Sequence, residues 1–247
     1  MSNPFQSKSG QSARHWELLQ QLAGREISES VRGSALGAAW LVLGPLLSLG
    51  LYVVVFGVLF GGKFGQVENE TSLGFAIGVY IGLSVVNLIN ESIGKATGNL
   101  FKHTNLIKKV VFPLPILPVV QVAGTGFKLA VNTVLWVAMG VVFGTVLSWE
   151  ILYLPLIFLP VLAIALGLAA LISALSVYIR DIQQVTTILS QVVFWSSGVF
   201  YSSIRVKEVP ELWAILKWNP VLLAVENLRN IVLWGLPPDF LQLGYIY

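Results

Sequence analysis

Long stretches without a charged residue constrain this chain more than any other feature of its sequence. A helix that crosses the hydrocarbon core of a bilayer needs about 20 consecutive, mostly apolar residues. Five stretches approach or exceed this length, although the third contains Lys128. We therefore expect an all-α, polytopic membrane protein with about five spans, near residues 36–60, 73–89, 117–146, 151–178 and 182–203.

The overall composition supports this expectation and excludes several kinds of site. Hydrophobic residues make up 55% of the 247 residues and charged residues only 11%, whereas soluble domains carry about 25% charged residues. The sequence contains no cysteine, which rules out disulfides and thiolate metal ligands. Its histidines, His15 and His103, stand in separate polar segments. We therefore expect neither a metal nor a cofactor in this chain, and a single transmembrane domain over residues 1–247.

The distribution of basic residues predicts how the chain is oriented. The segment 91–112 carries four lysines, whereas the segment 62–72 carries one lysine and two glutamates. Because basic residues concentrate in cytoplasmic loops, we expect the N-terminus and 91–112 inside and 62–72 outside. The net charge of +3 is explained by these loops, so we expect no nucleic-acid partner.

The polar N-terminal segment has the pattern of an amphipathic helix. Between residues 12 and 32, Trp16, Leu19, Ala23 and Ile27 recur every three or four positions. A helix of this kind before a first span is expected to lie in the cytoplasmic interface of the membrane. Packing on another soluble domain is the alternative interpretation.

Residues 205–238 follow the fifth expected span and are too polar to cross the bilayer. They include three tryptophans, which favour the headgroup level, so we expect short, half-buried helices at the outer interface. Asn219 is a plausible N-cap and Pro220 suits the first turn of a helix. Glu226 and Arg229 stand three residues apart, so we expect them to pair on one helix face.

The pattern G-x-x-x-x-G-K occurs at residues 57–63 and would suggest a phosphate loop. Phe64 follows it instead of Ser or Thr, and the pattern ends an apolar helix instead of following a strand. We therefore expect no ATP site in this chain.

Lys128 interrupts the third expected span, eleven residues after Leu117. That places it about 16 Å along the helix, where a charge costs about 2.5–3.5 kcal/mol on insertion scales. Two interpretations remain open. Lys128 faces the bundle interior or a watery path, or the span begins later and the side chain reaches the cytoplasmic surface.

Three stretches together carry a resemblance to a known family. Residues 105–118 have the sequence NLIKKVVFPLPILP, residues 177–182 have VYIRDI, and Asn219-Pro220 is followed by Glu226 and Arg229. In order and spacing they resemble the coupling loop, the Tyr-Arg-Asp signature and the outer segment of the polysaccharide-export permeases of ABC transporters, type 2 exporter class. These permeases move O-antigen, capsule or teichoic acid chains.

The resemblance implies a homodimer in the bacterial cytoplasmic (inner) membrane, paired with a separate ATPase subunit that binds ATP and Mg. It implies a lipid-linked glycan as substrate, and no catalytic residue in this chain. It makes five residues candidates for ATPase coupling: Lys108, Lys109, Pro113, Arg180 and Asp181. The ordinary excess of positive charge on the cytoplasmic side explains Lys108 and Lys109 equally well.

The translocation path or its gate is expected to involve five further residues: Lys128, Asn219, Pro220, Glu226 and Arg229. Trp195, Phe200 and Tyr201, at the outer end of the fifth span, are candidates for stacking on glycan rings. Interface anchoring is the alternative role for these aromatic residues.

Other functions compete with polysaccharide export. An exporter of drugs or lipids of the same class would have the same sequence features. A secondary transporter would be expected to carry buried acidic residues or internal repeats, and the five expected spans contain no Asp or Glu in their interiors. The family has six spans, and this sequence stops at Tyr247, where the sixth is expected to begin. We therefore expect either a truncated chain or a divergent member.

Overall fold

The computed structural model describes residues 4–29, 37–59, 61–65, 70–102, 114–142, 148–179 and 181–247. Within these ranges the chain forms helices joined by turns, and no strand, as expected. The helical elements are, in chain order, α1 (Pro4–Glu29), the 3-10 helix η1 (Gly37–Ala39), α2 (Trp40–Tyr52), the π-helix η2 (Val53–Leu59), α3 (Ser72–Lys102), α5 (Ile116–Val142), the 3-10 helix η3 (Trp149–Tyr153), α6 (Leu154–Leu175), α7 (Ile182–Ser196), α8 (Ser203–Lys207), α9 (Pro210–Leu216), α10 (Pro220–Trp234) and α11 (Phe240–Ile246).

Four helical segments of the described chain are long and apolar enough to cross a membrane: Trp40–Leu59, Ser72–Gly98, Ile116–Val142 and Trp149–Leu175. They correspond to the first four expected spans. The second is longer than expected, because α3 continues to Lys102 instead of ending near residue 89. Glu91 and Lys95 therefore lie on this helix and not in a loop, which corrects the expectation that the spans contain no acidic residue.

The fifth expected span is shorter than its apolar sequence suggests. Helix α7 begins at Ile182, as expected, but ends at Ser196 instead of near residue 203. Its 15 residues extend about 22 Å, less than the hydrocarbon core of about 30 Å. The chain turns at Gly198, whose φ of 71° favours glycine. A Cβ atom there would also lie 2.3 Å from Leu222, so this turn depends on the missing side chain.

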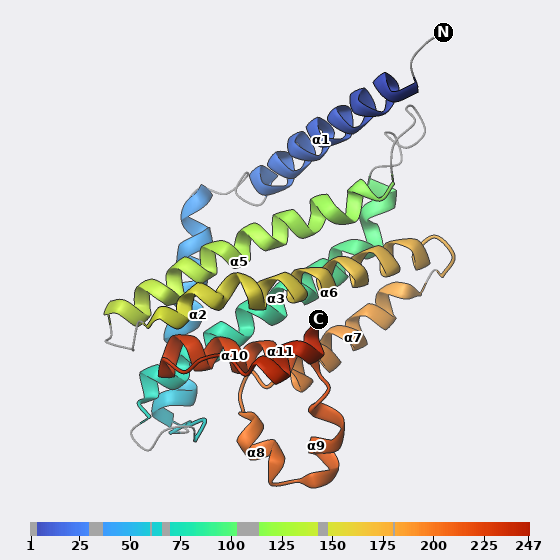
Figure 1. The fold of residues 1–247 in the computed structure, drawn as a ribbon. Helices are drawn as coiled ribbons and strands as arrows, with labels where there is room; N and C mark the ends of the chain where they lie inside the picture. Colours follow the sequence, from blue (N-terminus) through green and yellow to red (C-terminus); the bar gives the residue numbers. More distant parts are fainter. Residues whose placement is uncertain are drawn as a thin grey trace.

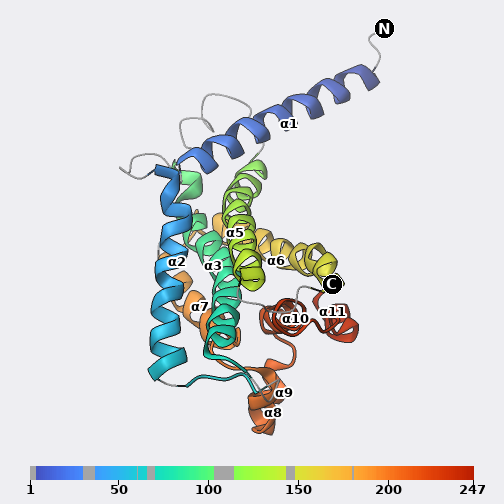
Figure 2. The same ribbon diagram turned by 90° about the vertical axis from the view of Figure 1, so that its left-hand side faces the viewer.

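Helix α3 is the central element of the bundle in Figures 1 and 2. It contacts α2, η2, α5, α6, α7 and α10, and Ile77, Ile81 and Ile89 on it are fully buried. Two glycines let other segments approach it closely. A Cβ atom would lie 2.5 Å from the Phe64 ring at Gly78 and 3.2 Å from the Arg229 guanidinium at Gly82.

The amphipathic helix expected at the N-terminus is present as α1 and packs along α5. Leu19, Ala23 and Ile27 of the expected apolar stripe are half-buried, whereas Trp16 is exposed. In both ribbon views α1 lies at one end of the bundle and α8 and α9 lie at the other. This arrangement fits the expected placement of the two polar segments on opposite sides of a membrane.

The segment after α7 forms short helices, as expected, but their burial differs from the half-buried arrangement that was predicted. Helices α8 and α9 expose most of their residues. Helix α10 instead has 12 buried residues out of 15 and packs against α3 and α6. The expectation of a half-buried surface helix is therefore wrong for α10. It failed because the sequence pattern does not show that glycines on α3 leave room for this helix.

Candidate functional site

Arg229 on α10 is fully buried and binds the turn that follows α7. Its Nη1 donates hydrogen bonds to the carbonyl oxygens of Gly198 and Tyr201, at 2.8 and 3.1 Å. Its Nη2 donates to Val199 at 2.6 Å, and its Nε donates to Gly78 of α3 at 3.0 Å. One guanidinium therefore holds three carbonyls of the turn and one carbonyl of the central helix.

Segment 61–65 also packs against Arg229 and the turn that it binds. The Arg229 guanidinium lies 4.0 Å from the centre of the fully buried Phe64 ring, within the range of a cation–π interaction. Phe64 also stacks on Phe75 with ring centres 4.5 Å apart, and its carbonyl accepts a hydrogen bond from Ser202 at 2.8 Å. Segment 61–65, the turn after α7 and α10 thus form one scaffold, which we call the outer scaffold because the sequence predicts that this end faces outside.

Glu226 contacts the far end of this turn and not Arg229. Its Oε1 accepts a hydrogen bond from the Ser203 backbone N–H at 2.5 Å. Both residues are described, and no ion pair within 4.0 Å joins Glu226 to Arg229, so the expected direct pair is wrong. The side chains instead diverge toward separate backbone partners. Burial lowers the pKa of Arg229 to about 10, while Glu226 raises it, which leaves the guanidinium protonated at neutral pH.

The predicted start of α10 is confirmed. The Asn219 side chain accepts hydrogen bonds from the N–H groups of Val221 and Leu222, and Pro220 occupies the first turn. The Asn219 amide also donates to the Ser196 carbonyl at 2.9 Å. Asn219 therefore joins the end of α7 to the beginning of α10.

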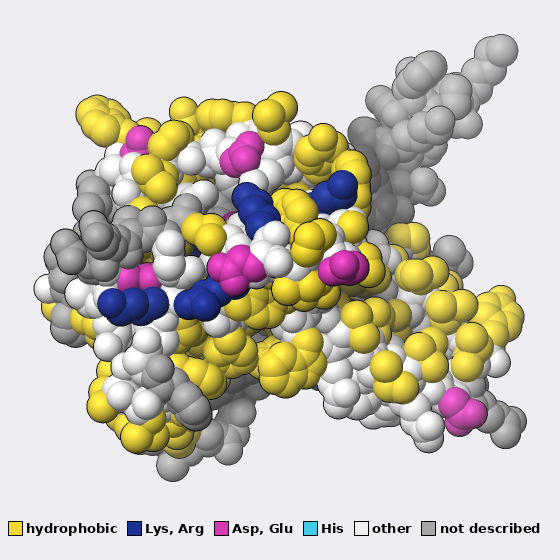
Figure 3. Space-filling model, turned by 90° about the horizontal axis from the view of Figure 1, so that it is seen from below, with side chains coloured by type: hydrophobic (Ala, Val, Ile, Leu, Met, Phe, Trp, Pro, Cys, Tyr) yellow, Lys and Arg dark blue, Asp and Glu magenta, His cyan; other side chains and the backbone are white. Residues whose placement is uncertain are grey.

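An open groove of about 690 Å³ lies beside this scaffold, between α7, α8 and α9. Its lining is formed by Ile188, Gln191, Val192, Trp195, Ser196, Tyr201, Arg205, Val206, Leu212 and Leu216. Trp195 is 66% exposed, and the Tyr201 hydroxyl donates to the Trp195 carbonyl at 2.7 Å. Seen from below in Figure 3, this end of the molecule carries charged side chains of both signs among hydrophobic ones.

The three candidates for glycan stacking separate in the structure. Trp195 and Tyr201 line the groove. Phe200 instead packs inward, with its ring centre 4.6 Å from that of Phe56 and 5.8 Å from that of Phe194. Two of the three rings are therefore placed to meet a ligand in the groove, and the third contributes to packing.

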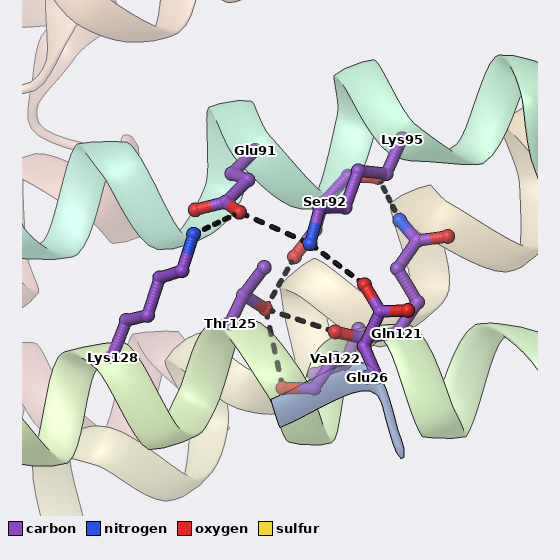
Figure 4. Close-up of polar contacts among 8 residues, drawn as sticks. All are labelled: Glu26, Glu91, Ser92, Lys95, Gln121, Val122, Thr125 and Lys128. Carbon is purple, nitrogen blue, oxygen red and sulfur yellow. Dashed lines mark hydrogen bonds and ion pairs between the residues drawn. The ribbon is translucent and has the colours of Figure 1, made fainter. Parts of the chain in front are cut away.

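Near the middle of α5, Lys128 belongs to a chain of ion pairs (Figure 4). The Lys128 Nζ lies 2.6 Å from the Glu91 carboxylate, and the Lys95 Nζ lies 3.1 Å from the same oxygen. Lys95 also lies 2.7 Å from the carboxylate of Glu26 on α1. We call Glu26, Lys95, Glu91 and Lys128 the inner cluster. It joins α1, α3 and α5.

Uncharged side chains reinforce the contact between α3 and α5 beside this cluster. The Gln121 amide donates to the Ser92 carbonyl, and the Ser92 and Thr125 hydroxyls are hydrogen-bonded at 3.0 Å. Figure 4 shows these groups in the space between the two helices. Gly124 of α5 lies at the place where Glu26 passes, because a Cβ atom there would lie 2.7 Å from the Glu26 Cγ.

Lys128 and Asn132 border two cavities. One, of about 230 Å³, lies between α3 and α5 and is lined by Ser84, Asn87, Leu88, Asn90, Glu91, Thr125, Lys128, Leu129 and Asn132. The other, of about 260 Å³, lies toward α2 and is lined by Trp40, Leu41, Pro45, Lys128, Val131 and Asn132. Lys128 is thus directed between helices, although its place in a translocation path stays a prediction.

Comparison with known proteins identifies the kind of membrane protein to which this architecture belongs. A sequence model of the ABC-2 type transporter family matches residues 17–233. The chain belongs to the ABC-2 type transporter family. This confirms the type 2 exporter class that the three sequence stretches indicated, and a multi-pass membrane architecture.

Individual members of this family that resemble the chain come from two bacteria. The O-antigen export system permease protein RfbA of Myxococcus xanthus is 25% identical over 222 residues, which cover 90% of this chain and 82% of the relative. Two proteins of the same name from Klebsiella pneumoniae are 23% and 22% identical over 223 and 235 residues. Those alignments cover 89% and 94% of this chain, and 82% and 86% of the relatives.

Of the five candidates for ATPase coupling, four lie outside the described residues: Lys108, Lys109, Pro113 and Arg180. Asp181 is exposed and directly precedes α7, and its side chain makes no capping hydrogen bond to that helix. The assignment of these residues to coupling therefore stays a prediction for this ABC-2 transporter.

Sequence reasoning missed several residues that the structure brings to these sites. Glu91 and Lys95 were assigned to a loop, although Glu91 stands directly after an apolar run and shares a helical spacing of four with Lys95. Gly74, Gly78 and Gly82 recur every four residues, a spacing typical of close helix contacts that was visible in the sequence. No local sequence pattern indicated a role for Glu26, because its partner Lys95 is 69 residues away.

Proposed function

We propose that this chain is the membrane-spanning permease of an ATP-driven exporter that moves lipid-linked polysaccharide out of the cytoplasm. One observation carries the proposal. Three relatives named as O-antigen export permeases align with the chain over 82–86% of their own length. The likeness therefore extends over most of the chain, instead of being confined to one apolar segment.

The subunit arrangement that we propose rests on the resemblance to polysaccharide-export permeases and on the lack of a phosphate-loop context in this chain. Its G-x-x-x-x-G-K pattern lacks the context of a phosphate loop, so ATP would be hydrolysed by a separate ATPase subunit. That subunit would contact the stretch 105–118, which is expected to face the cytoplasm, and the turn near Asp181. Two copies of the permease would enclose the path in the bacterial inner membrane.

The outer groove has the chemistry that a sugar polymer needs at an exit. Trp195 and Tyr201 offer flat rings, against which the apolar face of a pyranose can pack. Gln191 and Arg205 supply hydrogen-bond donors at the same surface. The groove is open, and Arg229 holds the turn that carries Tyr201 in its wall.

Export can be tested directly in a host whose own polysaccharide permease has been deleted. The chain would be expressed with the ATPase subunit and the glycan enzymes of its source. Polymer should reach the cell surface with both subunits, and should accumulate inside when the ATPase carries a substitution of its phosphate-loop lysine. If lipids or drugs leave the cell and the polymer does not, the substrate proposal fails while the exporter class stands.

The orientation that we propose has its own test. Because the chain has no cysteine, single cysteines at Ser7, Asn69 and Thr104 can be labelled without background. An impermeant thiol reagent applied to intact inner-membrane spheroplasts should label the cysteine at 69 and leave those at 7 and 104 unmodified. Labelling at 104 without labelling at 69 would reverse the topology.

A further inference from the structure

The inner cluster balances its charges across three helices. Two lysines, Lys95 and Lys128, face two carboxylates, Glu26 and Glu91, and all three contacts measure 2.6–3.1 Å. Glu91 is shared, since one of its oxygens contacts both ammonium groups. The four formal charges cancel only because α1 contributes Glu26. Among the described residues, Glu91 is the one other carboxylate in ion-pair contact with Lys95 and Lys128.

The contribution of α1 depends on a specific contact. The Glu26 side chain is only 16% exposed. It crosses α5 at Gly124, where any side chain would collide with the Glu26 Cγ at 2.7 Å. Glu26 therefore reaches Lys95 on α3 through a gap in the surface of α5. The ion pair forms only when this part of α1 lies against α5.

The cluster stands at the edge of a polar cavity. Lys128 and Glu91 line the cavity of about 230 Å³ between α3 and α5, together with three asparagines. Among its lining groups, the Asn90 Oδ1 is buried and has no hydrogen-bond partner in the described chain. A polar cavity of this size admits water or a small polar group. In such a site one uncompensated charge attracts ions of the opposite sign and repels ions of the same sign more strongly than it would in bulk water.

We propose that α1 sets the electrostatic charge of this cavity. With Glu26 in place, the inner cluster is neutral and the cavity does not favour an anion. When α1 withdraws, Lys95 competes with Lys128 for Glu91, and the cavity gains one net positive charge. It then attracts a small anion of about the size of a phosphate group. This inference goes beyond the proposed export function and holds or fails without reference to transport.

The charge of the cavity can be measured by its preference between two thiol reagents. Because the chain lacks cysteine, Asn132→Cys gives a single reporter on the cavity wall. Rates of modification in membranes are compared for a sulfonate-bearing and a trimethylammonium-bearing methanethiosulfonate. Glu26→Gln should raise the rate of the anionic reagent about tenfold and lower that of the cationic reagent about tenfold, so that the anion-to-cation ratio rises about a hundredfold, as expected for a unit charge within about 10 Å at an effective dielectric constant of about 20. Glu91→Gln should raise it at least as much.

Matched variants separate this effect from others. Glu17→Gln removes an exposed carboxylate from the same helix and should leave the ratio unchanged. A Gln191→Cys reporter in the outer groove should not respond to Glu26→Gln. The double variant Glu26→Gln/Lys95→Met restores neutrality and should return the ratio to that of the parent.

Two results would overturn the proposal. An unchanged ratio in Glu26→Gln means that the cavity does not sense α1. A ratio that stays high in the double variant means that lost contact, and not charge, opened the cavity. If Glu26→Gln does not reach the membrane, Glu26→Asp keeps the charge and shortens the reach by one methylene. That variant should give a ratio close to the parent's, and a ratio raised as far as in Glu91→Gln would count against the proposal, because contact and not charge would then control the cavity.

Discussion

Replacing Arg229 by methionine tests the outer scaffold most sharply. Methionine keeps an unbranched apolar stem but removes all the guanidinium donors. Four carbonyl oxygens, on Gly78, Gly198, Val199 and Tyr201, lose a hydrogen bond in a fully buried site. A hydrogen bond to a charged group contributes about 1.5–3 kcal/mol. Four such losses are not additive, and we expect a destabilisation of about 3–5 kcal/mol, as for other broken buried charge contacts.

A shift of that size is measurable on purified protein. For a chain of this length, 1 kcal/mol corresponds to about 2–4 °C in Tm, so the variant should melt about 10 °C below the parent in mild detergent. A cysteine at Gln191 should also change its labelling rate, because the turn that forms the groove is released. Arg205→Met, an exposed arginine on α8, is the control and should stay within about 0.5 kcal/mol. An Arg229→Met protein that melts with the control would refute this account of the scaffold.

Three further predictions concern neighbouring positions. Glu226→Ala should lower the free energy of unfolding by about 1–3 kcal/mol, because the Ser203 N–H loses its acceptor. Glu226→Gln keeps an oxygen there and should lower it less. Equal melting temperatures of the two variants would indicate that only the charge matters. Gly78→Ala places a Cβ atom 2.5 Å from Phe64 and should cost about 1–3 kcal/mol, with Gly44→Ala, which has open space around it, as the matched control. Trp195→Ala should reduce export at unchanged Tm, and a lowered Tm with normal export would instead assign the ring to packing.

The spans and the start of α10 could be predicted because each depends on local sequence. A charge-free run of about 20 residues is typical of a membrane span. It must form a helix there, because backbone groups in lipid have to be hydrogen-bonded within the segment. Asn219 followed by Pro220 specifies a helix start through contacts within three residues, and both roles are confirmed. The ABC-2 type class was likewise predictable, from the order of short motifs along the chain.

The contacts at both candidate sites could not be predicted, because their partners are distant in the sequence. Glu26 and Lys95 are 69 residues apart, Glu91 and Lys128 are 37 apart, and Arg229 and Gly78 are 151 apart. A local rule therefore paired Glu226 with Arg229, at a spacing that isolated helices favour. In the folded chain, backbone carbonyls of the turn offer Arg229 more partners than Glu226 does. For the same reason the predicted second span ended too early: a charged side chain that is paired with another helix does not terminate a membrane helix.

Helix α3 connects the two sites. Its Gly78 carbonyl binds Arg229 in the outer scaffold, and its Glu91 and Lys95 form the middle of the inner cluster. Gly78 and Glu91 lie on one continuous helix, about 20 Å apart along its axis. Arg229 also binds the turn that carries Tyr201. One helix therefore contributes residues both to the inner cluster and to the support of the groove.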